Sequence, residues 1–294
     1  MDAEISSVKK LAPEEIAFKP EVKLKTAKPV PNSPVGIFDS GVGGLTVLSE
    51  FVKALPDEDV IYLADTVHVP YGSRPPEEII EINVKILDYF IERGVKMIIM
   101  ACGTSSSIAY PVLKEKYHVP IVAMIEPGAR AALQATRNKK IGVIATMGTV
   151  NSGAFQKKIA EFDKEAKVFA EACPLFVPLI EGGFIEADET KKVARQYLKP
   201  LLKEGIDSLI LGCTHYPHLK KVISEITGPE VTLVDPAAEV VQDAKKILSK
   251  NAMLNNKTTK PKYEYVATSS PLQFQDLGSR LTGRPIPSVK LVKL

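Results

Sequence analysis

The stretch "RGVKMIIMAC" (93–102) recurs without gaps as "EGIDSLILGC" (204–213). The glycine and the final cysteine coincide, and the apolar positions between them match in type. A second pair, "VGIFDS" (35–40) and "IGVIAT" (141–146), corresponds in the same order and at a nearly equal offset. Because a repeated sequence marks a repeated structural unit, these two matches predict a duplication within the chain.

Apolar runs of strand length alternate with longer helical patterns along the chain, which is typical of parallel α/β proteins. Helices are clearest over 45–55 and from the Pro75-Pro76 pair to Phe90. Strands are expected near 35–39, 60–64, 97–102, 120–125, 141–146, 167–172, 207–213 and 231–235, with another near 263–268. We therefore predict an α/β fold of two pseudo-symmetric parallel-sheet domains, with the active site in the crevice between them.

Composition indicates an ordinary globular protein: of 294 residues, 45% are hydrophobic and 25% are charged. The 38 basic and 35 acidic residues are interspersed and give a net charge of +3, which favours a small-molecule partner over nucleic acid or a membrane. No apolar run approaches the roughly 18 residues of a membrane helix, and no secretory signal is evident. We expect a cytoplasmic protein.

Residues 1–34 contain five prolines and little apolar periodicity, so we predict an irregular N-terminal extension with one short helix near 13–18. The three cysteines, Cys102, Cys173 and Cys213, are too scattered for a disulfide framework. Any role they have is reactive or structural. Cys173 precedes a proline and has no polar motif beside it, so we interpret it as a small buried residue.

Two of the thiols stand at equivalent places in the duplicated unit. Cys102 and Cys213 each end a predicted strand, and open parallel sheets bind ligands beyond the carboxyl ends of their strands. Two such units facing one another would present one thiol from each side. A stereocentre held between two acid/base groups can lose a proton to one and regain it from the other, which inverts it.

The neighbouring residues suit such chemistry. A helix start follows each thiol, and free backbone N–H groups there favour a thiolate or bind a carboxylate. An ordinary thiol, with a pKa of about 8.5, is only slightly ionised at neutral pH, so an adjacent acid/base group would help it. Asp39, at the end of the first strand, and His215, two residues after Cys213, are the candidates.

Other readings of these residues stay open. Cys102, Cys213 and His215 could supply three zinc ligands, although no C-x-x-C or H-x-x-x-H spacing supports a metal site. A hydrolase or amidotransferase could use one cysteine as a nucleophile with His215 as its base. The glycine-rich stretch 41–44 is no dinucleotide fingerprint, because the G-x-G-x-x-G spacing fails at Thr46.

Seven stretches together carry a family resemblance. They are "FDSGVGGLTV" (38–47), "DTVHVPYG" (65–72), "ACGTSS" (101–106), "IEPGARAA" (125–132), "ATMGTVNS" (145–152), "CPLFVPLIEGG" (173–183) and "GCTHYPHL" (212–219). From about residue 35 onward the chain resembles the glutamate racemases, in the cofactor-independent aspartate/glutamate racemase superfamily. The resemblance implies two similar domains, 35–126 with 235–294 and 127–234.

The same resemblance implies an isomerase that interconverts L- and D-glutamate without metal or pyridoxal phosphate and supplies D-glutamate for peptidoglycan. It also implies a homodimer. By position, Cys102 would donate or accept the proton on the D-glutamate side and Cys213 on the L-glutamate side. Asp39 would assist Cys102, and Glu181 and His215 would assist Cys213. The implied substrate-binding residues are Asp39, Ser40, Tyr71, Gly72, Gly103, Thr104, Thr146, Thr149, Thr214 and His215.

One residue departs from the family pattern. The first cysteine of the family is usually followed by asparagine, whereas Gly103 follows Cys102 here. We expect a glutamate racemase with an altered site for the amino-acid head group. A racemase of aspartate, and a family member of low activity that binds or regulates, are the alternatives.

Overall fold

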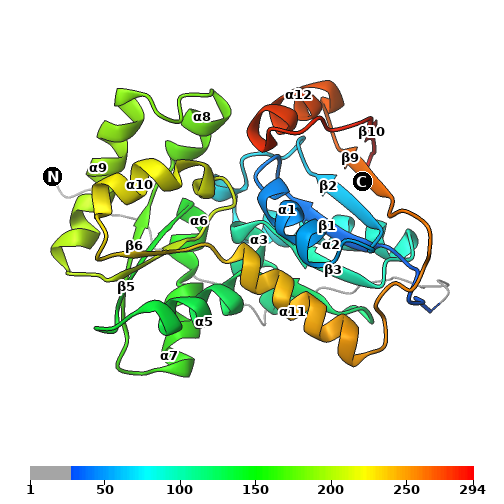
Figure 1. Cartoon of the computed structure of the whole chain (residues 1–294), viewed down its shortest axis with the longest axis horizontal. Helices are drawn as coiled ribbons and strands as arrows, with labels where there is room; N and C mark the ends of the chain where they lie inside the picture. The colour runs from blue at the N-terminus through cyan, green and yellow to red at the C-terminus, as the bar shows by residue number, and fades with distance from the viewer. Residues whose placement is uncertain (1–27) are drawn as a thin grey trace, which may run out of the picture.

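The structure is a computed structural model that describes residues 28–294. These residues contain two parallel β-sheets (Figure 1). One sheet has six strands in the order β10-β9-β2-β1-β3-β4, and the other has four in the order β6-β5-β7-β8. The helix expected near 13–18 lies outside the described residues. Residues 28–34 of the predicted extension form neither helix nor strand.

All nine predicted strands are present. The six-stranded sheet contains β1 (Val35–Asp39), β2 (Val60–Ala64), β3 (Met97–Met100), β4 (Ile121–Ala123), β9 (Tyr263–Ala267) and β10 (Val289–Leu291). The four-stranded sheet contains β5 (Lys140–Ala145), β6 (Lys167–Ala172), β7 (Ser208–Leu211) and β8 (Thr232–Val234). The short edge strand β10 was not expected, since three half-exposed residues give no clear period.

The predicted duplication is confirmed by strand order and register. The order β2-β1-β3-β4 in one sheet matches β6-β5-β7-β8 in the other. Within them Val35 lies opposite Met97, and Ile141 lies opposite Ser208. These are the positions that the repeated stretches align, so both copies build the same strand pair with the same register.

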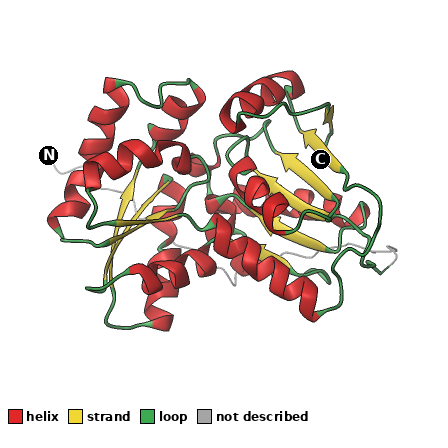
Figure 2. Ribbon diagram, in the orientation of Figure 1, coloured by secondary structure: helices red, strands yellow, loops and turns green. Residues whose placement is uncertain are grey.

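Helices cover both faces of each sheet (Figure 2). On the six-stranded sheet, one face packs against α1 (Leu45–Ala54), α11 (Ala237–Lys250) and α12 (Pro271–Thr282), and the other against α2 (Pro76–Glu92) and α4 (Tyr110–Leu113). On the four-stranded sheet, one face packs against α8 (Phe176–Glu181), α9 (Asp188–Lys203) and α10 (Lys220–Thr227), and the other against α5 (Ile125–Ala135) and α7 (Ala154–Phe162). Burial on both faces explains the continuous apolar runs of the strands.

The chain passes from the first sheet to the second through α5 and returns from β8 through α11, and these two helices contact one another. Strands from 35 to 123 and from 263 to 291 therefore share one sheet, and strands from 140 to 234 form the other. The predicted domain limits, 35–126 with 235–294 and 127–234, stay a prediction. No helix within residues 28–294 is long and apolar enough to cross a membrane.

Candidate active site

Each thiol lies just beyond the strand predicted to contain it. The strands were expected to run to Cys102 and Cys213, but β3 ends at Met100 and β7 at Leu211. Cys102 instead precedes α3 (Gly103–Ile108), and Cys213 precedes the short 3-10 helix η3 (Tyr216–Leu219). The strands stop two residues early because the backbone there turns into the following helix.

One cavity, of about 400 Å³ with its opening to solvent included, lies between the two halves of the molecule. Both thiols line it. So do most of the predicted substrate-binding residues: Asp39, Ser40, Tyr71, Gly72, Gly103, Thr104, Thr146, Thr214 and His215. Two predicted residues, Thr149 and Glu181, do not line the cavity and instead contact residues that do.

Cys213 has a buried acid/base partner. Nδ1 of His215 lies 3.9 Å from Sγ of Cys213, and Nε2 of the same ring lies 2.9 Å from Oε1 of Glu181. Burial alone would lower the pKa of His215, but the hydrogen bonds to Cys213 and Glu181 outweigh it and raise the pKa to about 10. An imidazolium at this place can stabilise negative charge that develops on the neighbouring sulfur.

Cys102 lies in a different electrostatic environment. Burial, followed by the negative charge of Asp39, raises the pKa of the Cys102 thiol to about 12, against smaller lowering contributions from Ser105. Burial also raises the pKa of Asp39 above its usual value, although the charge of His215 opposes this. At neutral pH the environment therefore favours a protonated thiol at Cys102.

Asp39 and Thr214 connect the two halves at the cavity. The Thr214 hydroxyl donates to Oδ1 of Asp39 at 3.3 Å, and the Thr46 hydroxyl donates to the Thr214 carbonyl oxygen at 3.2 Å. Because Asp39 and Thr46 belong to the first half and Thr214 to the second, these bonds hold the loop after β7 against the end of β1 and the start of α1.

A line of hydroxyl groups crosses between the halves on another side of the cavity. Oγ1 of Thr104, in α3, lies 2.9 Å from Oγ1 of Thr146, which precedes α6 (Met147–Ser152). Thr146 in turn lies 3.2 Å from Oγ1 of Thr149. Such hydroxyls can donate or accept, so they can bind a carboxylate or an ammonium group without adding charge.

Asp65 is a functional candidate that sequence reasoning missed. It follows β2 directly, and its fully buried carboxylate accepts from the Tyr71 hydroxyl at 2.5 Å and from the Thr268 hydroxyl at 2.8 Å. Nδ1 of His68 lies 2.8 Å from the same carboxylate. Asp65 thus fixes Tyr71, which lines the cavity. Its position at the carboxyl end of a parallel strand was the available signal.

Cys173 lies away from the cavity and is fully buried, with its sulfur 3.7 Å from the Glu171 carbonyl oxygen. Burial raises the pKa of this thiol well above its usual value, so the thiol stays protonated at neutral pH. Among residues 28–294, no group of three or more histidine, cysteine or acidic side chains is arranged to hold a metal ion.

Comparison with known proteins shows which family has a similar sequence. The profile of the Asp/Glu/hydantoin racemase family matches residues 39–244. A glutamate racemase of Geobacter metallireducens is 43% identical and aligns over 90% of this chain and 98% of its own.

Two solved structures share the fold. A glutamate racemase isoform of Bacillus anthracis superposes with a TM-score of 0.86 at 36% identity, covering 90% of this chain and 98% of its own. A glutamate racemase of Francisella tularensis in complex with D-glutamate superposes with a TM-score of 0.84 at 34% identity and the same coverage. Two parallel sheets in this arrangement, a cavity between two matched thiols, and a family match over most of the chain agree: the chain belongs to the Asp/Glu/hydantoin racemase family and is an isomerase.

Proposed function

We propose that this protein is a glutamate racemase that exchanges a proton at Cα between the thiols of Cys102 and Cys213. The observation that carries the proposal is that the repeated unit brings one cysteine from each half to the same cavity. A single nucleophile would need only one of them. The named relatives, all glutamate racemases in the comparisons above, support glutamate as the substrate.

The electrostatics supply a starting state for the reaction. The charged His215, held by Glu181, can stabilise negative charge on Cys213, while burial and Asp39 keep Cys102 protonated. With L-glutamate bound, the Cys213 thiolate would take the Cα proton. Cys102 would then give its own proton to the opposite face, leaving a thiol at Cys213 and a thiolate at Cys102. D-glutamate would react by the reverse transfers.

Uncharged donors would hold the substrate. Ser40, Thr104, Thr146 and Thr214, whose side chains carry hydroxyls, line the cavity together with Gly72 and Gly103. A nearby arginine would bind the carboxylates of the substrate but would also stabilise a wrongly ionised state of the site. Neutral hydrogen bonds avoid that, because they bind carboxylates without a full positive charge.

Turnover followed by circular dichroism, starting from L- and from D-glutamate, tests the proposal directly. We expect racemisation in both directions, with deuterium appearing at Cα in deuterated water. Cys102→Ala and Cys213→Ala should each abolish it, a loss of at least a thousandfold, since each removes the thiol that would transfer the Cα proton on one face. Racemisation without exchange of the Cα proton would be incompatible with two thiol bases.

The alternatives give different results in the same assay. A hydrolase or amidotransferase needs one thiol only, so it would keep its activity when the other thiol is replaced. It would also accumulate an acyl-enzyme. An aspartate racemase would turn over aspartate faster than glutamate. A binding or regulatory protein would bind glutamate with turnover near zero.

The supply of D-glutamate for peptidoglycan and the assembly into a homodimer belong to the same proposal. Gly103, where the family usually has asparagine, would alter the contacts to the head group of the substrate. Gly103→Asn tests that point, because equal activity of the variant and the parent on glutamate would mean that the head-group site is unaltered.

A further inference from the structure

Gly103 and Gly212 both line the cavity and meet backbone to backbone. A β-carbon placed on Gly103 would overlap the carbonyl oxygen of Gly212. The carbonyl belongs to the chain leaving β7, which the neighbouring strand and Phe155 hold on the other side: a β-carbon on Gly212 would lie 2.9 Å from the Ile144 oxygen. The Gly212 segment therefore has little room to move aside locally.

The contact is part of a larger pattern. A β-carbon on Gly72 would lie 2.8 Å from Cβ of Thr146, and one on Gly148 would lie 3.2 Å from the Gly72 oxygen. A β-carbon on Gly43 would overlap the Thr214 hydroxyl. At each of these places a glycine of one half lies against the other half, so the halves approach to the limit that glycine allows.

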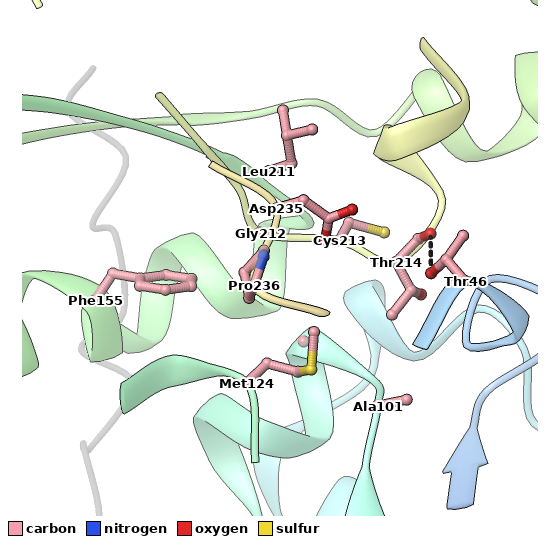
Figure 3. A pocket seen from close by; sticks show the side chains of 11 residues that line it. Thr46, Ala101, Met124, Phe155, Leu211, Gly212, Cys213, Thr214, Asp235 and Pro236 are labelled. Carbon is pink, nitrogen blue, oxygen red and sulfur yellow. Dashed lines mark hydrogen bonds between the residues drawn. The ribbon is translucent and has the colours of Figure 1, made fainter. Parts of the chain in front are cut away.

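A second, smaller cavity, here called the rear cavity, is also lined by Gly103 and Gly212. Figure 3 shows it from close by. It is bounded by Met124, Asp235 and Pro236, at the point where the chain returns between the halves. Four residues line both cavities: Gly103, Gly212, Cys213 and Thr214. In Figure 3, Cys213 and Thr214 project from this shared segment, and the dashed line shows Thr46 bound to Thr214.

We propose that Gly103 is the closure residue of this enzyme: because it has no side chain, the two thiol-bearing segments meet, and their contact separates the substrate cavity from the rear cavity. Two consequences follow. The contact sets the distance across which Cys102 and Cys213 face the substrate, and it keeps rear-cavity water from Cys102, which is 5% exposed and does not line the rear cavity. The effect on turnover rests on the proposed racemisation, whereas the effect on thiol access does not.

Gly103→Ala is the sharpest test, with Gly103→Asn beside it. In the absence of substrate, we expect iodoacetamide to alkylate Cys102 and Cys213 about tenfold faster in either variant than in the parent, as mapped by peptide mass spectrometry. On glutamate, we expect kcat/KM to fall at least tenfold in both directions, because the halves stand further apart. Alanine and asparagine should behave alike, since the obstruction is the β-carbon.

Gly278→Ala is the matched control. Its β-carbon would lie 2.5 Å from Cδ1 of Ile286 and 2.8 Å from Cδ1 of Leu45, two side-chain ends, and Gly278 lines neither cavity. This variant should lose stability but keep the alkylation rates and KM of the parent. Gly148→Ala, with its milder obstruction, should shift both readouts in the same direction as Gly103→Ala by a smaller factor, and serves if the latter does not fold.

Alkylation rates and kcat/KM within twofold of the parent in Gly103→Ala, or the same changes in Gly278→Ala, would overturn the closure role. An asparagine variant more active than the alanine variant would also overturn it, because a contact to the substrate head group, and not the β-carbon, would then determine the activity. A parent that fails to racemise glutamate would count against the proposed function alone. In that case the alkylation comparison still decides the closure role.

Discussion

At residue 215, a buried imidazole lies between the thiol of Cys213 and the carboxylate of Glu181. The pKa of His215 in the folded protein, about 10, is above its usual 6.5. The imidazolium is therefore present at neutral pH and is lost as the pH rises through about 10. Any stability that it contributes is complete below pH 6.5 and disappears over the same rise.

We predict that kcat/KM for L-glutamate falls on the alkaline side near pH 10, and that Glu181→Gln moves this fall to lower pH. Removing the carboxylate partner lowers the pKa of the imidazole by about one unit, as the loss of a near charge usually does. The measurement is the pH profile of kcat/KM for both proteins, with urea unfolding as a check on folding. An alkaline limb that stays in place in Glu181→Gln would contradict the role given to this pair.

Asp65 acts through Tyr71 and should be recognisable as a positioning residue. Asp65→Asn weakens the hydrogen bond to the Tyr71 hydroxyl and should cost about 1 kcal/mol of substrate binding, or about a fivefold increase in KM, with little change in kcat. Tyr71→Phe should reproduce the increase, and the double variant should cost no more than Tyr71→Phe alone. Additive increases in KM would show that the two residues act separately.

Among the elements, β3 is held at its start by a buried ion pair. Nζ of Lys96 lies 2.5 Å from Oε2 of Glu58, and both side chains are almost fully buried. Lys96 also donates to the Met253 carbonyl oxygen at 2.8 Å, and Glu58 accepts from the Asn255 backbone N–H at 2.8 Å. The pair thus joins the start of β3 to the segment that leads toward β9.

Lys96→Met should destabilise the protein by about 3–5 kcal/mol, because it leaves the Glu58 carboxylate buried without its partner. The double variant Lys96→Met/Glu58→Gln should recover part of that loss, since no unpaired charge remains. Urea unfolding of the parent and both variants measures this. A double variant less stable than Lys96→Met would show that the carboxylate does not depend on the ion pair.

The elements themselves were largely predictable. β1 and β2 occur where the apolar runs place them, because strands buried on both faces need continuous apolar residues and little else. The strands β3 and β7 each end two residues earlier than predicted. At β3, for example, the apolar character of Ala101 and Cys102 does not indicate where the backbone turns. β10 pairs only through contacts with β9 and was not visible in the sequence.

For the whole molecule, the two halves make one cavity, so one ligand should protect both thiols together. With glutamate at about a hundred times its Kd, we expect the alkylation rates of Cys102 and Cys213 to fall in parallel by about a hundredfold, the fraction of free protein. Cys173, fully buried elsewhere, should stay unreactive with and without glutamate. Peptide mapping after timed alkylation measures all three. Protection of one thiol alone would mean that they do not share a substrate site.

The sequence by itself determined the fold class, the duplication and the pair of thiols, because periodicity and repetition are local properties that each segment carries with it. The tertiary structure alone decided which groups meet across the cavity: Asp39 reaches Thr214 across 175 positions and Asp65 fixes Tyr71. It also shows that Gly103, which in the sequence is only the lack of an asparagine side chain, lies in close contact with Gly212. Such contacts depend on how two finished halves pack, and that packing is set by their combined surfaces and by no single segment.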